Sequence, residues 1–172
     1  ASAALPIFVL LTLEVRSLFQ PTTVMTPDAS FVERAAYVAV WGAFALAALW
    51  KARLDGDLVA LWAWRLSGGV AVAVVLIVQV LIANPVFEPA DVGRLPILNG
   101  LLLAYAVPAA MAALARRWID IEPDRRVDVL VGATASILAF AYVSVEVRHF
   151  FDPGFERRGF DARGLELYAY SI

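Results

Sequence analysis

Long apolar runs, separated by short polar segments, make up most of this 172-residue chain, in which 62% of the residues are hydrophobic and 17% are charged. A helix needs roughly 20 predominantly apolar residues to cross the hydrocarbon core of a bilayer. Alternation of polar and apolar residues is absent, and a helix satisfies its own backbone groups in lipid. We therefore expect an all-α, multi-pass transmembrane helical bundle with spans at about 5–19, 31–52, 58–83, 95–115 and 127–151.

The segments between the apolar runs contain turn-forming residues and many of the charges. Residues 20–28 and 84–93 are rich in proline, which favours breaks between helices. Ser30, followed three positions later by Glu33, predicts a capping box at the start of the second helix. Lys and Arg gather in the loops after the second and fourth spans, and the positive-inside rule assigns those loops to the cytoplasm.

The composition excludes several classes of site. The chain has no cysteine, one histidine and a formal net charge of −2. Disulfides, thiolate metal sites and multi-histidine metal cages are therefore excluded, and no basic patch favours nucleic acid as a partner. The sequence also contains no phosphate-binding glycine loop and no serine elbow. We expect neither a metal nor a cofactor.

One motif occurs twice. Residues 12–21 read TLEVRSLFQP and residues 144–153 read SVEVRHFFDP, with Glu, Val, Arg, Phe and Pro in the same register. Four expected helices separate the copies, so both would enter the membrane in the same direction and form a parallel repeat, unlike the inverted repeats of many transporters. The likeness continues in ERAAY and ELYAY, which predicts repeated helical hairpins at about 12–52 and 144–172, the second one truncated.

The charges of the motif need partners, because a single charge at the centre of a bilayer costs roughly 3 kcal/mol on insertion scales. Glu14 and Arg16 lie about 200° apart around a helix and do not neutralise each other. Two pairing schemes follow: Arg16 with Glu33 and Arg148 with Glu166 across each hairpin, or Glu14 with Arg148 and Glu146 with Arg16 between facing repeats. Snorkelling of the arginines is the third alternative, since both motifs lie near expected extracytoplasmic helix ends.

The candidate functional or ion-pair cluster contains the charged, imidazole and phenolic groups of both copies, namely Glu14, Arg16, Glu33, Tyr37, Glu146, Arg148, His149, Glu166 and Tyr170. These groups either fix the packing of the repeats through interhelical ion pairs, which is the favoured interpretation, or line a polar cavity open to the outer side. His149 is interpreted as an interfacial residue rather than a catalytic base, because no nucleophile with a supporting carboxylate is apparent.

Two residues inside the apolar runs predict local features. Gln79 is expected to bond a neighbouring helix rather than to face a cavity, because polar side chains within apolar spans find partners across helices. Pro108 is expected to kink the fourth span.

The segments TLEVRSLF, SVEVRHFF, ELYAYS and NPVFEPADVGRLPILNGLLLAYAVPAAMAALARR together resemble the bacterial predicted membrane proteins of domain of unknown function 2339. The resemblance covers most of the chain. It implies a long multi-pass protein of the bacterial inner membrane, of which residues 1–172 would be a fragment forming one transmembrane region. In that family the motif often has His after Arg; His149 matches and Ser17 does not, which places in doubt any role that needs two histidines. The resemblance supplies no activity.

Three classes of function remain after these exclusions. The first, which we favour, is a scaffold or assembly component of the cell envelope. The second is a transporter or channel for a small polar or lipidic substrate. The third is an enzyme acting on a lipid-linked substrate at the outer leaflet, with Glu14 or Glu146 as general base. The expected partners are the lipid bilayer and, beyond it, other envelope proteins or a lipidic ligand.

Overall fold

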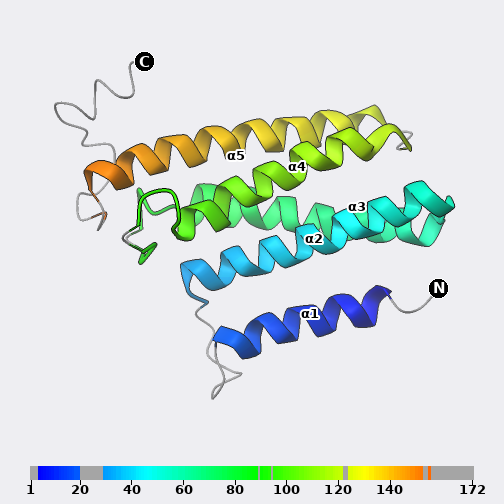
Figure 1. Cartoon of the computed structure of the whole chain (residues 1–172), viewed down its shortest axis with the longest axis horizontal. Helices are drawn as coiled ribbons and strands as arrows, with labels where there is room; N and C mark the ends of the chain where they lie inside the picture. The colour runs from blue at the N-terminus through cyan, green and yellow to red at the C-terminus, as the bar shows by residue number, and fades with distance from the viewer. Residues whose placement is uncertain are drawn as a thin grey trace.

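A computed structural model describes residues 4–19, 29–88, 90–93, 95–121, 124–152 and 155, and the regular structure in this part of the chain is entirely helical. The helices lie side by side along the long axis of the molecule (Figure 1). They are α1 (Ala4–Phe19), α2 (Phe31–Asp55), α3 (Leu58–Ala73) with the π-helix η1 (Val74–Ile82), the π-helix η2 (Leu102–Ala106) with α4 (Val107–Trp118), the short 3-10 helix η3 (Ile119–Ile121) and α5 (Arg125–Phe151).

Three of these helical stretches are long and apolar enough to cross a membrane, namely Phe31–Asp55, Leu58–Ile82 and Arg125–Phe151. Large apolar side chains cover their outer faces: Leu66 on α3 is 66% exposed and Phe140 on α5 is 76% exposed. Apolar exposure on this scale is typical of surfaces that contact lipid. The remaining two expected spans, at about 5–19 and 95–115, contain helix but stay predictions as membrane crossings.

The hairpin of α2 and α3 follows from the residues at its ends. The Ser30 hydroxyl accepts a hydrogen bond from the Glu33 amide at 3.1 Å, which confirms the predicted cap of α2. Gly56 ends α2 in the left-handed conformation, with φ of 65°, and Asp57 then caps α3 through the amides of Val59 and Ala60. This short turn lays α3 back along α2.

The expected start of the fourth helix near residue 95 is wrong. Helical backbone begins at Gly100, because the Asn99 side chain accepts hydrogen bonds from the amides of Leu101 and Leu102 at 2.9 and 3.2 Å and so acts as the N-cap. Residues 95–99 instead form an irregular segment in which Ile97 has a φ of 67°. An apolar run alone does not distinguish such a segment from a helix.

The proline in the fourth helix is accommodated by a widened turn and by Gln79. Pro108 has no amide hydrogen to donate to the carbonyl of Ala104, four residues earlier, and the π-helical turns of η2 relieve the ring clash at this point. The fully buried Gln79 amide, oriented so that both its ends are satisfied, donates to the Ala104 carbonyl at 3.3 Å and accepts from the Ala35 amide at 3.1 Å. This agrees with the expectation that Gln79 bonds neighbouring helices.

A second contact ties the same two segments together. The buried Tyr105 hydroxyl donates to the backbone carbonyl of Gln79 at 2.9 Å, within the π-helix η1. Each widened helix thus receives a hydrogen bond from the other at the same level. The buried cluster around this crossing includes Phe31, Val38 and Leu138, so it joins α2, η1, η2 and α5.

We expect Tyr105→Phe to destabilise the fold by about 1–3 kcal/mol, because the buried Gln79 carbonyl loses its donor and the ring volume is unchanged. The measurement is thermal or denaturant unfolding of the full-length protein in nanodiscs. Tyr142→Phe on α5, where the side chain is half-buried, is the matched control and should change stability by less than about 0.5 kcal/mol. Equal losses in the two variants would contradict this account of the crossing.

Candidate functional site

Both copies of the repeated motif lie at the same end of the bundle. Figure 1 shows that α1 ends, α2 begins and α5 ends at one end, opposite the α2–α3 and α4–α5 turns. The irregular segment before α4 lies at this end as well. The polar side chains of the motif are therefore positioned where helices and connecting segments meet.

The first copy joins α1 to α2 through an ion pair. Arg16 Nη1 lies 2.9 Å from Glu33 Oε1, and the Glu33 side chain is only 1% exposed. The Tyr37 hydroxyl donates to the same carboxylate oxygen at 3.3 Å, as the i, i+4 spacing predicts. The structure contains the Arg16–Glu33 pair of the scheme across each hairpin, and Glu14 is exposed on α1; the second pair of that scheme, Arg148 with Glu166, stays a prediction.

Polar and aromatic contacts extend this attachment of α1. The Trp41 indole nitrogen donates to the Thr12 hydroxyl at 3.0 Å, and the Trp41 ring also lies 5.8 Å from the ring of Phe8. The contacts run along α1 and α2 from the ion pair toward the opposite end. Arg16 and Glu33 therefore fix one end of an interface that continues through the uncharged side chains of Thr12, Trp41 and Phe8.

The second copy holds the irregular segment onto α5. Glu146 Oε1 accepts a hydrogen bond from the Ile97 amide at 2.7 Å, and Glu146 Oε2 accepts one from the Asn99 side chain at 3.0 Å. The Asn99 oxygen is already engaged as the cap of the next helix. A single carboxylate on α5 thus organises both the segment and the start of the helix that leads into α4.

The backbone of Ile97 explains why an anion is useful at this position. A β-branched residue in the left-handed region is a strained arrangement, of order 1–3 kcal/mol, that persists only where its surroundings impose it. A charge-assisted hydrogen bond to the Ile97 amide supplies such a restraint. The carboxylate of Glu146 stabilises a backbone conformation that Ile97 would not otherwise keep.

His149 contacts Gly93, which precedes the irregular segment in the sequence. Its Nε2 lies 2.9 Å from the Gly93 carbonyl, and because a carbonyl only accepts, Nε2 carries the hydrogen. The other ring nitrogen, Nδ1, faces the Asn99 amide nitrogen at 3.4 Å and lies 3.9 Å from Glu146 Oε1. The ring is 1% exposed and stacks on Phe155 with centroids 5.8 Å apart. Both ring nitrogens therefore face protein groups.

Arg148 points to a different neighbourhood from Glu146. It is 2% exposed, and its Nη2 lies 3.7 Å from Asp152 Oδ2, one turn further along at the end of α5. The expected partner Glu166, with Tyr170, lies outside the described residues. The structure brings Glu146 and His149 together and places Arg16, Glu33 and Tyr37 in a separate cluster.

The second polar cluster consists of Glu146, His149 and their partners Gly93, Ile97 and Asn99. Sequence reasoning missed these three partners. The signal for Asn99 was present, because an Asn directly before an apolar run is a helix N-cap signature. Gly93, with φ of 86°, and Ile97 contribute backbone groups. No residue type marks a backbone contact of that kind in a sequence.

The two clusters form fixed contacts between protein groups. No set of three or more His, Asp or Glu side chains is arranged to hold a metal ion in the part of the chain that the structure describes. The carboxylates of Glu33 and Glu146 accept hydrogen bonds from Arg16 and from the Ile97 amide, respectively. Such contacts hold helices and connecting segments in position.

We expect the two identical Glu-Val-Arg triplets to respond differently to the same substitution. Glu146→Gln removes a charged acceptor from the Ile97 amide and should cost about 1–3 kcal/mol of unfolding free energy. Glu14→Gln changes an exposed residue and should stay within about 0.5 kcal/mol of wild type. The test is unfolding of both full-length variants under identical conditions, and similar losses for the two would refute the assigned asymmetry.

The comparisons with known proteins agree with the helical architecture. A family model described as a predicted membrane protein, DUF2339, matches residues 1–172. No curated protein and no solved structure matches the chain. Since the model covers the whole sequence, the chain belongs to the predicted membrane protein family DUF2339.

Proposed function

We propose that this chain is a multi-pass scaffold or assembly component of the bacterial cell envelope, embedded in the inner membrane. In this proposal the repeated motifs fix helices and connecting segments at the extracytoplasmic end, and the resulting rigid bundle presents its outer faces to lipid and to other envelope proteins. The observation that carries the proposal is the engagement of Glu33 and Glu146 by groups of the chain itself.

The geometry of both clusters supports a structural use of the motif charges. The ion pair of Arg16 and Glu33 crosses from one helix to the next, and the bonds of Glu146 cross from α5 to the segment before α4. In each case the contact joins two separate elements, 17 residues apart in the first cluster and 49 in the second. A relay or substrate clamp would instead need these groups to exchange partners with a moving ion or ligand.

The same features weigh against an enzyme at this end of the bundle. A general base has to reach the proton that it abstracts. The Nε2 hydrogen of His149 is directed to Gly93, and its Nδ1 faces Asn99. Glu146 is bonded to the Ile97 amide.

The position of both motif copies at one end of the bundle supports a parallel repeat, with hairpins at about 12–52 and 144–172.

A charge swap between Arg16 and Glu33 tests the proposal. Each single reversal, Arg16→Glu or Glu33→Arg, should destabilise the full-length protein by about 3 kcal/mol or more, because a buried charge then faces a like charge. The double variant restores an ion pair of opposite polarity and should recover up to about 3 kcal/mol of this loss. The readouts are unfolding in nanodiscs and the size of crosslinked complexes in envelope membranes.

A scaffold predicts that complex size follows stability, lost in each single reversal and restored in the double variant. Lys51→Glu, at an exposed ion pair with Asp55, is the control and should leave complex size unchanged. If wild-type protein in proteoliposomes passes an ion or a small solute, and the stable double variant does not, the scaffold proposal is wrong and a transport role replaces it. Complexes that are unaffected by all variants would also contradict it.

A further inference from the structure

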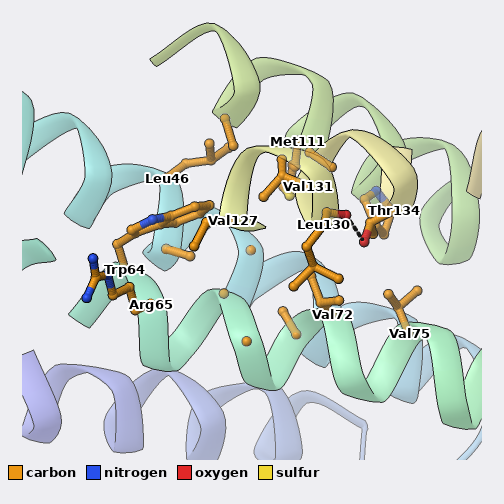
Figure 2. A pocket seen from close by; sticks show the side chains of 18 of the residues that line it. Leu46, Trp64, Arg65, Val72, Val75, Met111, Val127, Leu130, Val131 and Thr134 are labelled. Carbon is orange, nitrogen blue, oxygen red and sulfur yellow. Dashed lines mark hydrogen bonds between the residues drawn. The ribbon is translucent and has the colours of Figure 1, made fainter. Parts of the chain in front are cut away.

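A cavity of about 340 Å³ lies between α3 and α5, away from both polar clusters. It lies between two buried apolar clusters. Val38 and Leu138 belong to the cluster around the crossing of η1 and η2, and Trp64 and Val131 belong to another apolar cluster, which also contains Leu49. Its volume falls in the range of small-molecule and lipid sites, about 300–1,000 Å³. Figure 2 shows the side chains that surround it.

Small and apolar residues line the cavity along most of its length. Gly42 and Gly68 lie where helices or rings approach closely, since an added Cβ would come within 2.8 Å of Met111 and 3.2 Å of Trp64, respectively. Gly69 differs, because nothing lies within 4 Å of its Cβ position. Gly69 and Leu130, which is 50% exposed, both line the cavity, so it opens on the outer face between α3 and α5.

The cavity is elongated along the helices. On α3 and η1 its lining runs from Arg65 to Val75, which corresponds to about 15 Å at the rise of an α-helix. Figure 2 shows Arg65 and Trp64 at one end and Val75 at the other. A length of about 15 Å is half of the roughly 30 Å hydrocarbon thickness of a bilayer, which is the depth of one leaflet.

The charged side chains of the cavity lining, Arg65 and Asp124, lie at one end, whereas the Thr134 hydroxyl, farther along, donates to the Leu130 carbonyl within α5. The Arg65 guanidinium lies 5.1 Å from the ring of Trp62. The opposite charge at this end belongs to Asp124, which also caps α5 through the Arg126 amide. A guanidinium has five N–H donors, so Arg65 can bind a phosphate in addition to its other contacts.

Trp64 lines the cavity at the same end. Its side chain is buried, and its indole N–H has no acceptor among the residues that the structure describes. A buried donor without an acceptor is costly, and such groups ordinarily find a partner. Because the nitrogen itself is enclosed by protein atoms, a lipid oxygen would have to displace a neighbouring side chain to reach it.

We propose that the cavity binds one acyl chain of a phospholipid, with the lipid phosphate beside Arg65 and a headgroup ammonium beside Asp124. The apolar lining matches the chain, the length matches one leaflet, and the two charges match a zwitterionic headgroup. The tryptophans at this end, Trp50, Trp62 and Trp118, belong to the residue type that marks the membrane interface.

A substitution that fills the cavity tests the proposed binding site for the acyl chain. Gly69→Phe adds a ring at a position with free space and replaces a poor helix former, so the melting temperature should not fall. The probe is phosphatidylethanolamine, added to delipidated full-length protein and counted by native mass spectrometry. We expect about tenfold weaker retention of one lipid in Gly69→Phe, because the ring occupies the site. Val70→Phe, at an exposed neighbour outside the cavity lining, should retain lipid as wild type does.

The headgroup assignment is tested with three lipids of equal chain length. Phosphatidylethanolamine should bind best, phosphatidylglycerol next and diacylglycerol least, with about tenfold between the first and the last. Arg65→Gln should remove the advantage of phosphatidylglycerol over diacylglycerol, and Asp124→Asn, which still caps α5, should remove the advantage of phosphatidylethanolamine over phosphatidylglycerol. Arg117→Gln, an exposed cation outside the lining, should preserve the order.

Three results would overturn the proposal. One is wild-type protein that retains no lipid, which is expected if another helix of the full-length protein fills the cavity. Another is equal loss of lipid in Gly69→Phe and Val70→Phe, which indicates annular rather than specific lipid. The third is equal retention of diacylglycerol and phosphatidylethanolamine, which removes the assigned roles of Arg65 and Asp124.

Discussion

Within the hydrocarbon region of a bilayer, a backbone polar group that leaves regular helix has to find a partner inside the protein, because lipid offers none. Two interruptions show how this is met. Pro108 leaves the Ala104 carbonyl without its helical donor, and the Gln79 side chain supplies one. The irregular segment before α4 exposes the Ile97 amide, and Glu146 accepts its hydrogen bond. Both solutions use a polar side chain from a distant helix, and they therefore also fix how the helices pack.

This constraint explains why two identical triplets have different roles. Glu146 faces an irregular segment with a free amide, whereas Glu14 faces outward from a peripheral helix that packs mainly on α2. In the first copy the bonded carboxylate comes from Glu33 on the next helix. The two copies thus share a sequence, but the residues that lie opposite each copy decide which groups its side chains bond. The polar contacts of Glu33 and Glu146 hold helices and connecting segments together at one end of the bundle. The apolar cavity between the helices lies away from that end and opens on the outer face between α3 and α5.

The sequence predicted the helical class, the Ser30 cap and the bonding of Gln79, because each depends on spacing or on the cost of an unpaired polar group in apolar surroundings. It gave the contact of Arg16 with Glu33 as one of three alternatives. It did not predict the irregular residues 95–99, since leucine and isoleucine occur both in apolar helices and in exposed turns at helix ends. The contacts of Glu146 and His149 were also out of reach, because their partners are mainly backbone atoms. The cavity depends on glycine and alanine residues of α2, α3 and α4 that lie along one stretch of the bundle, and a single sequence does not show which residues of different helices will face each other.

Amide hydrogen exchange at Ile97 tests most directly whether Glu146 holds the connection before α4. In full-length protein in nanodiscs, residue-resolved exchange should show a protected Ile97 amide, and Glu146→Gln should speed its exchange about tenfold or more. The Gly100 amide, bonded to the Val92 carbonyl at 2.7 Å, reports whether the rest of the segment stays in place. An Ile97 amide that exchanges like an unprotected peptide in wild-type protein, or that ignores Glu146→Gln, would contradict the account.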